Sequence, residues 1–144
     1  MSILALLLIS CSEKKHENCN PNTPMSFINI HSEKPVGTVK VYQYRNDILK
    51  DSMMFFADKK NKSDYVLTKD GDQNYSIELK KTYTYLDRFK VLIDRNEYIL
   101  KDFKVGPTKV GTNFQQKDLC EVQEYNINGQ LVKNNSVLID LGKK

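Results

Sequence analysis

Residues 75–79 and 89–93 alternate apolar and polar side chains with a period of two, and this pattern limits the chain to β-structure. Every second side chain of a strand lies on the same face, so Tyr75, Ile77 and Leu79 are expected to share one face. Similar short apolar runs recur from residue 25 onward, with almost no helical pattern between them. The sequence therefore predicts an all-β fold, an antiparallel β-sandwich of about seven to nine strands.

Turn-forming residues stand between the predicted strands, at residues 69–72, 94–96 and 128–129. Asp, Asn and Gly accept the backbone conformations that tight hairpins need, so each of these sites predicts a hairpin. We expect Gly106 and Pro107 to end the strand that precedes them at Val105. Residues 47–57 fit a helix face and a buried strand about equally well, and we interpret them as a strand because strands flank them.

Three segments of the predicted sandwich resemble transthyretin-like domains of the carboxypeptidase-regulatory type. They are residues 37–42, the turn 68–71 that leads into residues 74–79, and the strand at residues 89–93. The resemblance covers about residues 36–105 and implies an immunoglobulin-like or transthyretin-like sandwich. It implies no particular activity, because folds of this kind host many functions.

The apolar run at residues 3–9 leads into Leu8-Ile9-Ser10-Cys11. This junction resembles the lipobox of bacterial lipoproteins, in which a small residue precedes a cysteine that is lipidated and becomes the first mature residue. The run is too short to cross a bilayer, which needs about 20 residues. The resemblance implies a signal peptide and acyl chains on Cys11. The opening Met1-Ser2 lacks the usual basic residue, and a buried N-terminal strand is the alternative.

Residues 12–24 are polar and contain two prolines, which is typical of an extended, flexible tether. We therefore divide the chain into a signal peptide (1–10), a lipidated tether (11–24) and a sandwich domain (25–144). In lipoproteins of the type that this chain resembles, an Asp after the lipidated cysteine favours inner-membrane retention, whereas Ser12 stands here. We expect a lipid-anchored protein of the bacterial cell envelope, with the outer membrane favoured. The sequence leaves open whether the protein lies on the periplasmic face or on the cell surface.

Two further cysteines, Cys19 and Cys120, remain if Cys11 carries lipid. An even pair in an oxidising compartment favours a disulfide, which would close a loop of about 100 residues and pin the tether to a late strand. The alternative is two free thiols, with Cys120 buried as a small apolar side chain. The sequence leaves both readings open.

The formal net charge of +4 is spread over the chain and is interpreted as solvated surface, with acidic lipid headgroups or glycans as alternative partners. Nucleic acid is not expected as a partner.

Tyrosines beside lysines predict a surface that contacts protein or glycan. The set that we expect to form it is Lys80, Lys81, Tyr83 and Tyr85. Tyr42 and Tyr44 alternate with valines and also predict an aromatic face outside the core; packing across strand pairs is the alternative for these tyrosines.

Catalytic signals are sparse. The two histidines, His16 and His31, have no hydrolase motif around them, and His31 is expected at the surface. His16 and Cys19 are too few ligands for a metal, and no cofactor is expected. We therefore predict a non-catalytic binding or accessory module for an envelope protein or glycan. The alternative is a small envelope enzyme or enzyme inhibitor with a site built from loops.

Overall fold

The computed structural model describes residues 19–57, 65–71, 73–110 and 117–142, and within them the chain forms strands and no helix. The prediction of an all-β sandwich is confirmed. Eleven strands are described, more than the seven to nine expected, because several are very short. They are β1 (Phe27–His31), β2 (Thr38–Arg45), β3 (Ile48–Phe56), β4 (Tyr65–Val66), β5 (Thr68–Asp70), β6 (Asn74–Glu78), β7 (Arg88–Ile93), β8 (Asn96–Val110), β9 (Lys117–Ile127), β10 (Gln130–Lys133) and β11 (Leu138–Asp140).

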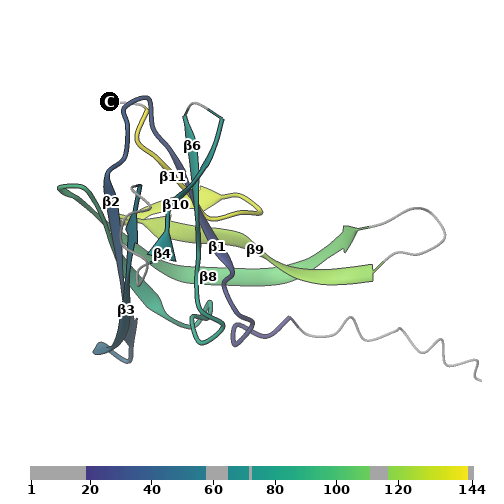
Figure 1. Cartoon of the computed structure of the whole chain (residues 1–144). Coiled ribbons are helices and arrows are strands. Elements are labelled where there is room, and N and C mark those ends of the chain that lie inside the picture. Colours follow the sequence, from purple (N-terminus) through teal and green to yellow (C-terminus); the bar gives the residue numbers. More distant parts are fainter. Residues whose placement is uncertain (1–18, 58–64, 72, 111–116, 143–144) are drawn as a thin grey trace, which may run out of the picture.

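The strands form two sheets, visible in Figure 1. The smaller sheet has the order β11-β1-β6-β5, and the larger sheet has the order β10-β9-β8-β7-β2-β3-β4. Neighbouring strands are antiparallel except for β1 with β11 and β3 with β4, which run parallel. Hairpins between consecutive strands account for most of the larger sheet, as the predicted turns require.

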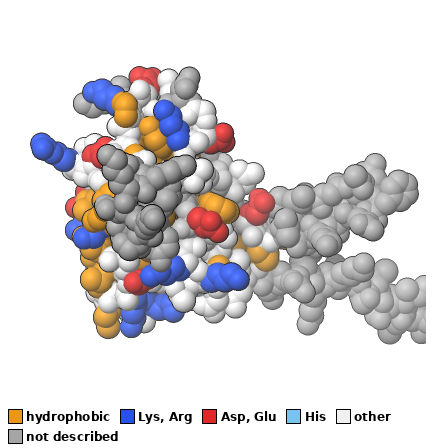
Figure 2. All heavy atoms as spheres, in the orientation of Figure 1, with side chains coloured by type: hydrophobic (Ala, Val, Ile, Leu, Met, Phe, Trp, Pro, Cys, Tyr) orange, Lys and Arg blue, Asp and Glu red, His pale blue; other side chains and the backbone are white. Residues whose placement is uncertain are grey.

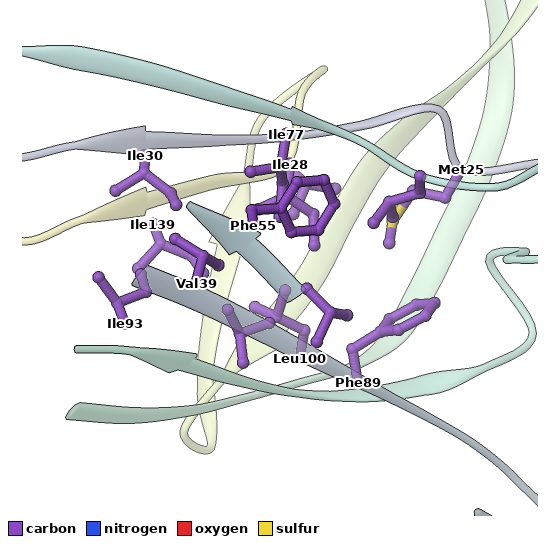
Figure 3. Close-up of a cluster of buried hydrophobic side chains, with 14 of the residues drawn as sticks. Met25, Ile28, Ile30, Val39, Phe55, Ile77, Phe89, Ile93, Leu100 and Ile139 are labelled. Carbon is purple, nitrogen blue, oxygen red and sulfur yellow. The ribbon is translucent and has the colours of Figure 1, made fainter. Parts of the chain in front are cut away.

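Apolar side chains from the inner faces of both sheets form a single core (Figure 3). The alternation in the sequence placed these residues correctly: Tyr75 and Ile77 of β6 and Phe89, Val91 and Ile93 of β7 are all buried. Residues 48–56 form the strand that we expected, with Phe55 buried. The core also takes in Met25, which precedes the first strand.

Hairpin turns occupy the expected positions. Asn128 and Gly129 both have positive φ angles, 50° and 82°, which is the conformation of a two-residue hairpin turn with the right-handed twist. Asn46 and Asp47 connect β2 to β3 with φ angles of 51° and 60°. Asn and Asp tolerate this left-handed region better than most residues, which explains why they occur here.

The expectation that Gly106 and Pro107 end a strand is wrong, because β8 continues through both residues to Val110. Pro107 lies opposite Cys120 of β9. The register shows that β7 pairs with β8 only from Asn96 to Leu100, so the other edge of β8 has no described neighbour at Pro107. A proline is tolerated at such an edge since no partner strand needs its missing N–H.

Beyond their pairing with β7 and β10, β8 and β9 continue as a two-stranded ribbon, residues 102–110 and 117–123, which we call the β8–β9 arm. Figure 1 shows this arm projecting from the rest of the sandwich. Its base is irregular: register shifts lie on both sides of Lys104, and Asp102 has a positive φ angle of 56°. Such β-bulges increase the local twist and bend of a ribbon.

The sulfur atoms of Cys19 and Cys120 are joined in a disulfide, with the two Cα atoms 5.3 Å apart. Of the two readings that the sequence left open, the structure has the bridged one. The chain that follows is docked on the domain: Tyr85 donates its N–H to the Thr23 carbonyl (3.3 Å), and Pro24 forms a β-bridge with Thr84. Residues 20–24 therefore belong to the folded body, and the part of the predicted tether before Cys19 lies outside the described residues.

Candidate binding surface

The surface expected from Lys80, Lys81, Tyr83 and Tyr85 does not form as an exposed aromatic patch. Tyr83 is completely buried, and its ring stacks on Phe89 with the ring centroids 5.9 Å apart. Tyr85 is half-buried. The expectation fails because these residues lie in a loop rather than a strand, and the alternation rule does not apply to loops.

The two lysines of this set have different contacts. Lys80 forms an ion pair with Asp51 of β3 (Nζ to Oδ2 3.0 Å). Lys81 and Tyr85 line a groove of about 730 Å³ beside the disulfide, together with Phe27 and Glu121. A second groove, of about 490 Å³, is lined by Lys80 and Lys81 but by neither tyrosine of the set, so the four residues do not share one concave surface.

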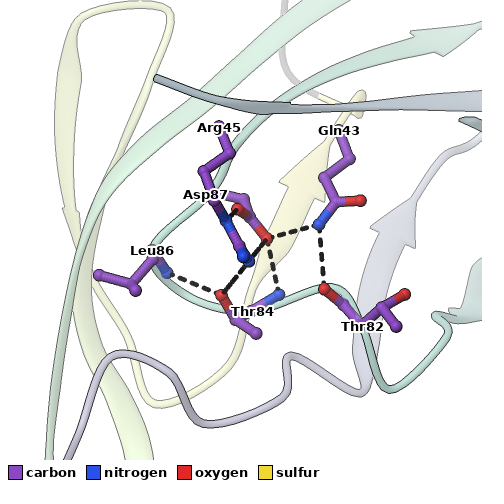
Figure 4. A network of polar contacts seen from close by, with 6 residues as sticks. All are labelled: Gln43, Arg45, Thr82, Thr84, Leu86 and Asp87. Atoms are coloured by element: carbon purple, nitrogen blue, oxygen red, sulfur yellow. Dashed lines mark hydrogen bonds and ion pairs between the residues drawn. The ribbon is translucent and has the colours of Figure 1, made fainter. Parts of the chain in front are cut away.

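The β6–β7 loop, residues 79–87, is fixed to β2 by the carboxylate of Asp87, whose side chain is fully buried (Figure 4). Asp87 accepts hydrogen bonds from Arg45 Nε (2.7 Å), from Gln43 Nε2 (2.7 Å) and from the backbone N–H of Thr84 (2.9 Å). Gln43 also donates to the Thr82 carbonyl (3.0 Å). Since its oxygens are occupied by donors of the protein, Asp87 serves as a structural anchor for the loop.

The donors around Asp87 keep it ionised. Burial raises the pKa of the Asp87 carboxyl, but the hydrogen bonds from Arg45, Thr84 and Gln43 and the positive charge of Arg45 outweigh that effect, so its pKa lies below the ordinary value. The same contact raises the pKa of Arg45 through its hydrogen bond and ion pair with Asp87. The pair is therefore charged at neutral pH.

Tyr42 and Tyr44 lie on the outer face of the larger sheet, where the sequence predicted an aromatic surface. On β2, the side chains of Val39, Val41 and Gln43 are buried, so Tyr42 and Tyr44 project from the opposite face and are only partly covered. In cross-strand register, Tyr42 lies between Ser52 and Lys90, and Tyr44 lies between Leu49 and Arg88.

Three cations pack on these two rings. Lys40 Nζ lies 4.8 Å from the centroid of the Tyr42 ring, and Lys90 Nζ lies 5.6 Å from the same centroid. Arg88 Cζ lies 4.8 Å from the centroid of the Tyr44 ring. We call these five residues, Lys40, Tyr42, Tyr44, Arg88 and Lys90, the tyrosine face. Cation–π contacts of this kind contribute about 0.5 to 1 kcal/mol each at exposed sites and hold the cations beside the phenol groups.

The cations of the tyrosine face have weak ionic partners. Lys90 is 3.7 Å from Glu97, and Arg88 is 3.6 Å from Asp47, whose side chain is 92% exposed. Lys40 forms no ion pair with any described residue. Exposed pairs at such distances contribute little, so these charges remain available to a ligand. Figure 2 shows blue basic and orange hydrophobic side chains interspersed along the side of the body where β2 and β3 lie in Figure 1.

The lysine and arginine of β7 were not part of the predicted site. Their strand was recognised from the alternation of Phe89, Val91 and Ile93, which also places Arg88 and Lys90 on the opposite face. The missing information was the pairing of β7 with β2, which are about 45 residues apart and become neighbours only in the folded sheet.

Other concave sites carry less chemistry. A pocket of about 410 Å³ is lined by Glu33 and Asp94, but Asp94 already accepts hydrogen bonds from the N–H groups of Gly37 (3.1 Å) and Thr38 (2.9 Å). His31 Nδ1 lies 3.0 Å from the amide oxygen of Asn74. Among the described residues, no three His, Cys, Asp or Glu side chains lie close enough to hold a metal ion.

In the part of the chain that the structure describes, no helix has the length and apolar character needed to cross a bilayer. The chain matches no protein-family model, no curated protein and no solved structure at a significant level.

Proposed function

We propose that this protein is a lipid-anchored, non-catalytic binding module of the bacterial cell envelope, with the outer membrane favoured. Its lipid would be carried by Cys11, and its ligand, an envelope protein or a glycan, would bind to the tyrosine face. The anchor is supported by the lipobox-like sequence that ends in Cys11, and an oxidising location is supported by the disulfide between Cys19 and Cys120.

The observation that carries the binding role is the placement of Tyr42 and Tyr44 on an open sheet face, with Lys40, Arg88 and Lys90 packed on their rings. Aromatic rings and arginine are the groups that contribute most to binding energy at protein interfaces. A broad face of this kind suits an extended partner better than a small substrate, which needs a concave site that surrounds it.

The proposal is tested with the lipidated protein purified from its native envelope. Chemical crosslinking followed by affinity capture identifies protein partners, and an array of envelope glycans identifies sugars. Tyr42→Ser with Tyr44→Ser should weaken binding of the captured ligand about tenfold or more, because the loss of two aromatic anchors removes contacts that each contribute on the order of 1 kcal/mol.

The matched control is Leu131→Ser, which removes another exposed apolar side chain (57% exposed) on β10, away from the tyrosine face. This variant should bind as the unchanged protein does. Circular dichroism checks that the double tyrosine variant keeps its strand content. Equal binding by the double variant and the control would show that the ligand contacts another surface.

A further inference from the structure

We propose that one end of the domain rests on the surface of the lipid bilayer, with Ile48, Leu49 and Leu86 in the interfacial layer. This end consists of residues 20–24, the β2–β3 turn with its flanking residues 45–50, and the β6–β7 loop at residues 79–87, and we call it the tether end. The inference rests on the lipid anchor of the proposed function and adds a second membrane contact and an orientation to it.

Direct contacts hold the three parts of the tether end together. Pro24 bridges Thr84, and Met25 donates its N–H to the Tyr83 carbonyl (2.8 Å), which joins the start of the domain to the β6–β7 loop. Arg45 at the end of β2 donates to Thr84 Oγ1 (3.3 Å) and to Asp87, which joins the β2–β3 turn to the same loop. Figure 1 shows all three parts at the lower end of the molecule.

The apolar residues at this end are unusually exposed. Ile48 is 59% exposed, Leu49 is 52% exposed and Leu86 is 51% exposed. Ile48 and Leu49 follow directly after the β2–β3 turn, where a hairpin tip presents them to solvent. Leu86 lies in the neighbouring β6–β7 loop, and large apolar side chains exposed on two linked segments mark a contact site more strongly than single exposed residues do.

The length of the tether places this end near the bilayer. Cys19 is fixed to the domain by its disulfide, and seven residues lie between it and Cys11, which makes eight steps from one Cα atom to the next. A fully extended chain spans at most about 3.6 Å per residue, so the lipidated cysteine lies within about 29 Å of Cys19. Residues 20–24, which belong to the tether end, follow Cys19 directly, so a short anchor keeps this end within reach of the membrane.

The charge of the tether end complements an anionic bilayer. Its residues include four cationic and two acidic side chains, a net charge of +2. The two acids already have basic neighbours, since Asp87 pairs with Arg45 and Asp47 lies near Arg88. Lys50 and Lys81 are exposed and form no ion pair with a described residue. Basic residues beside apolar ones are the combination that binds the interface of membranes with acidic lipids.

The chain contains no tryptophan, so single tryptophans can report on each position. Leu49→Trp and Leu86→Trp are each made in the lipidated protein, which is then reconstituted into vesicles of phosphatidylethanolamine with about a quarter phosphatidylglycerol. Both should show emission shifted to shorter wavelength. Lipids brominated in the acyl chains should quench both at least about twofold more than they quench the control Leu131→Trp, which lies outside the tether end.

A second pair of substitutions tests whether the side chains act together. In the Leu86→Trp protein, Ile48→Ser with Leu49→Ser should remove most of the blue shift and of the quenching, because the tip no longer enters the interface. Unchanged circular dichroism shows that the fold is intact. If Leu49→Trp and Leu86→Trp are no better quenched than Leu131→Trp, the contact does not exist, although the anchor stands when mass spectrometry finds lipid on Cys11. Absence of that lipid would overturn both the anchor and the contact.

Discussion

At the residue scale, Asp87 shows how one buried carboxylate determines the path of a loop. Its oxygens receive donors from Arg45 and Gln43 of β2 and from the backbone of Thr84, so the loop that carries Thr84 is bound to the sheet at several points. No sequence pattern identifies this role, because the partners are more than 40 residues away in β2 or in the same irregular loop. The burial of Tyr83 depends on the same loop and was missed for the same reason.

Asp87→Asn should lower the free energy of unfolding by about 2 kcal/mol at neutral pH, because it removes the charge of a buried carboxylate and leaves its donors, among them the partly exposed Arg45, poorly matched. Urea unfolding followed by circular dichroism measures this loss. Asp70→Asn, at an exposed position in β5, is the control and should change the free energy of unfolding by less than about 0.5 kcal/mol. Equal stability of the two variants would mean that Asp87 does not hold the loop.

The contribution of Asp87 should depend on pH in a defined direction. Its folded-state pKa is lowered, because the hydrogen bonds and the charge of Arg45 outweigh the effect of burial. The stabilisation is therefore complete above the unfolded-state pKa of about 3.9 and is lost as the pH falls below it. The difference in unfolding free energy between the unchanged protein and Asp87→Asn should be constant from neutral pH to about pH 5 and shrink below about pH 4. A difference that shrinks on raising the pH instead would contradict this assignment.

At the element scale, the strands and turns follow from local chemistry, whereas their pairing does not. Alternation predicted β6 and β7, and the Asn128-Gly129 pair predicted the β9–β10 hairpin. The error at Pro107 has a different origin. Proline forbids a central strand but not an edge, and the sequence does not reveal that β8 has lost its β7 neighbour at that point.

The disulfide is an element-scale constraint, because it ties the start of the domain to the β8–β9 arm across 101 residues of sequence. Cys19→Ser with Cys120→Ser should lower the free energy of unfolding by about 3 kcal/mol, because the unfolded chain has a higher conformational entropy without the disulfide. Reductant should destabilise the unchanged protein by a similar amount and leave the double variant unaffected. Two alkylatable thiols in the non-reduced mature protein would show that the bridge does not form in the cell.

At the scale of the whole molecule, a tethered module would use two adjoining surfaces for two different contacts. The tether end would face the lipid, and the tyrosine face runs along the larger sheet, with Tyr44 nearer to that end than Tyr42. The sequence predicted the fold class and the position of Tyr42 and Tyr44 on a face outside the core. It could not predict the complete surface, because Arg88 and Lys90 join the tyrosines only through the pairing of β7 with β2.

The anchor is tested by Cys11→Ser. If lipid on this thiol is what holds the protein, the variant should move from the membrane fraction to the soluble fraction, because a serine cannot be alkylated and no acyl chains then enter the bilayer. Fractionation followed by immunoblotting measures the change. Ser12→Ala is a suitable control and should stay with the membrane. Retention of the Cys11→Ser protein, or recovery of residues 1–10 on the mature unchanged protein, would contradict lipid anchoring.

The β8–β9 arm has a consequence for hydrogen exchange. Among the described residues, each of its strands pairs along one edge only, so about half of its amide protons point away from the ribbon. Amides at residues 103–106 should therefore take up deuterium well before those of β7, whose strand is flanked on both sides. Slow uptake in the arm of the envelope-bound protein would mark it as the place where another polypeptide adds a strand.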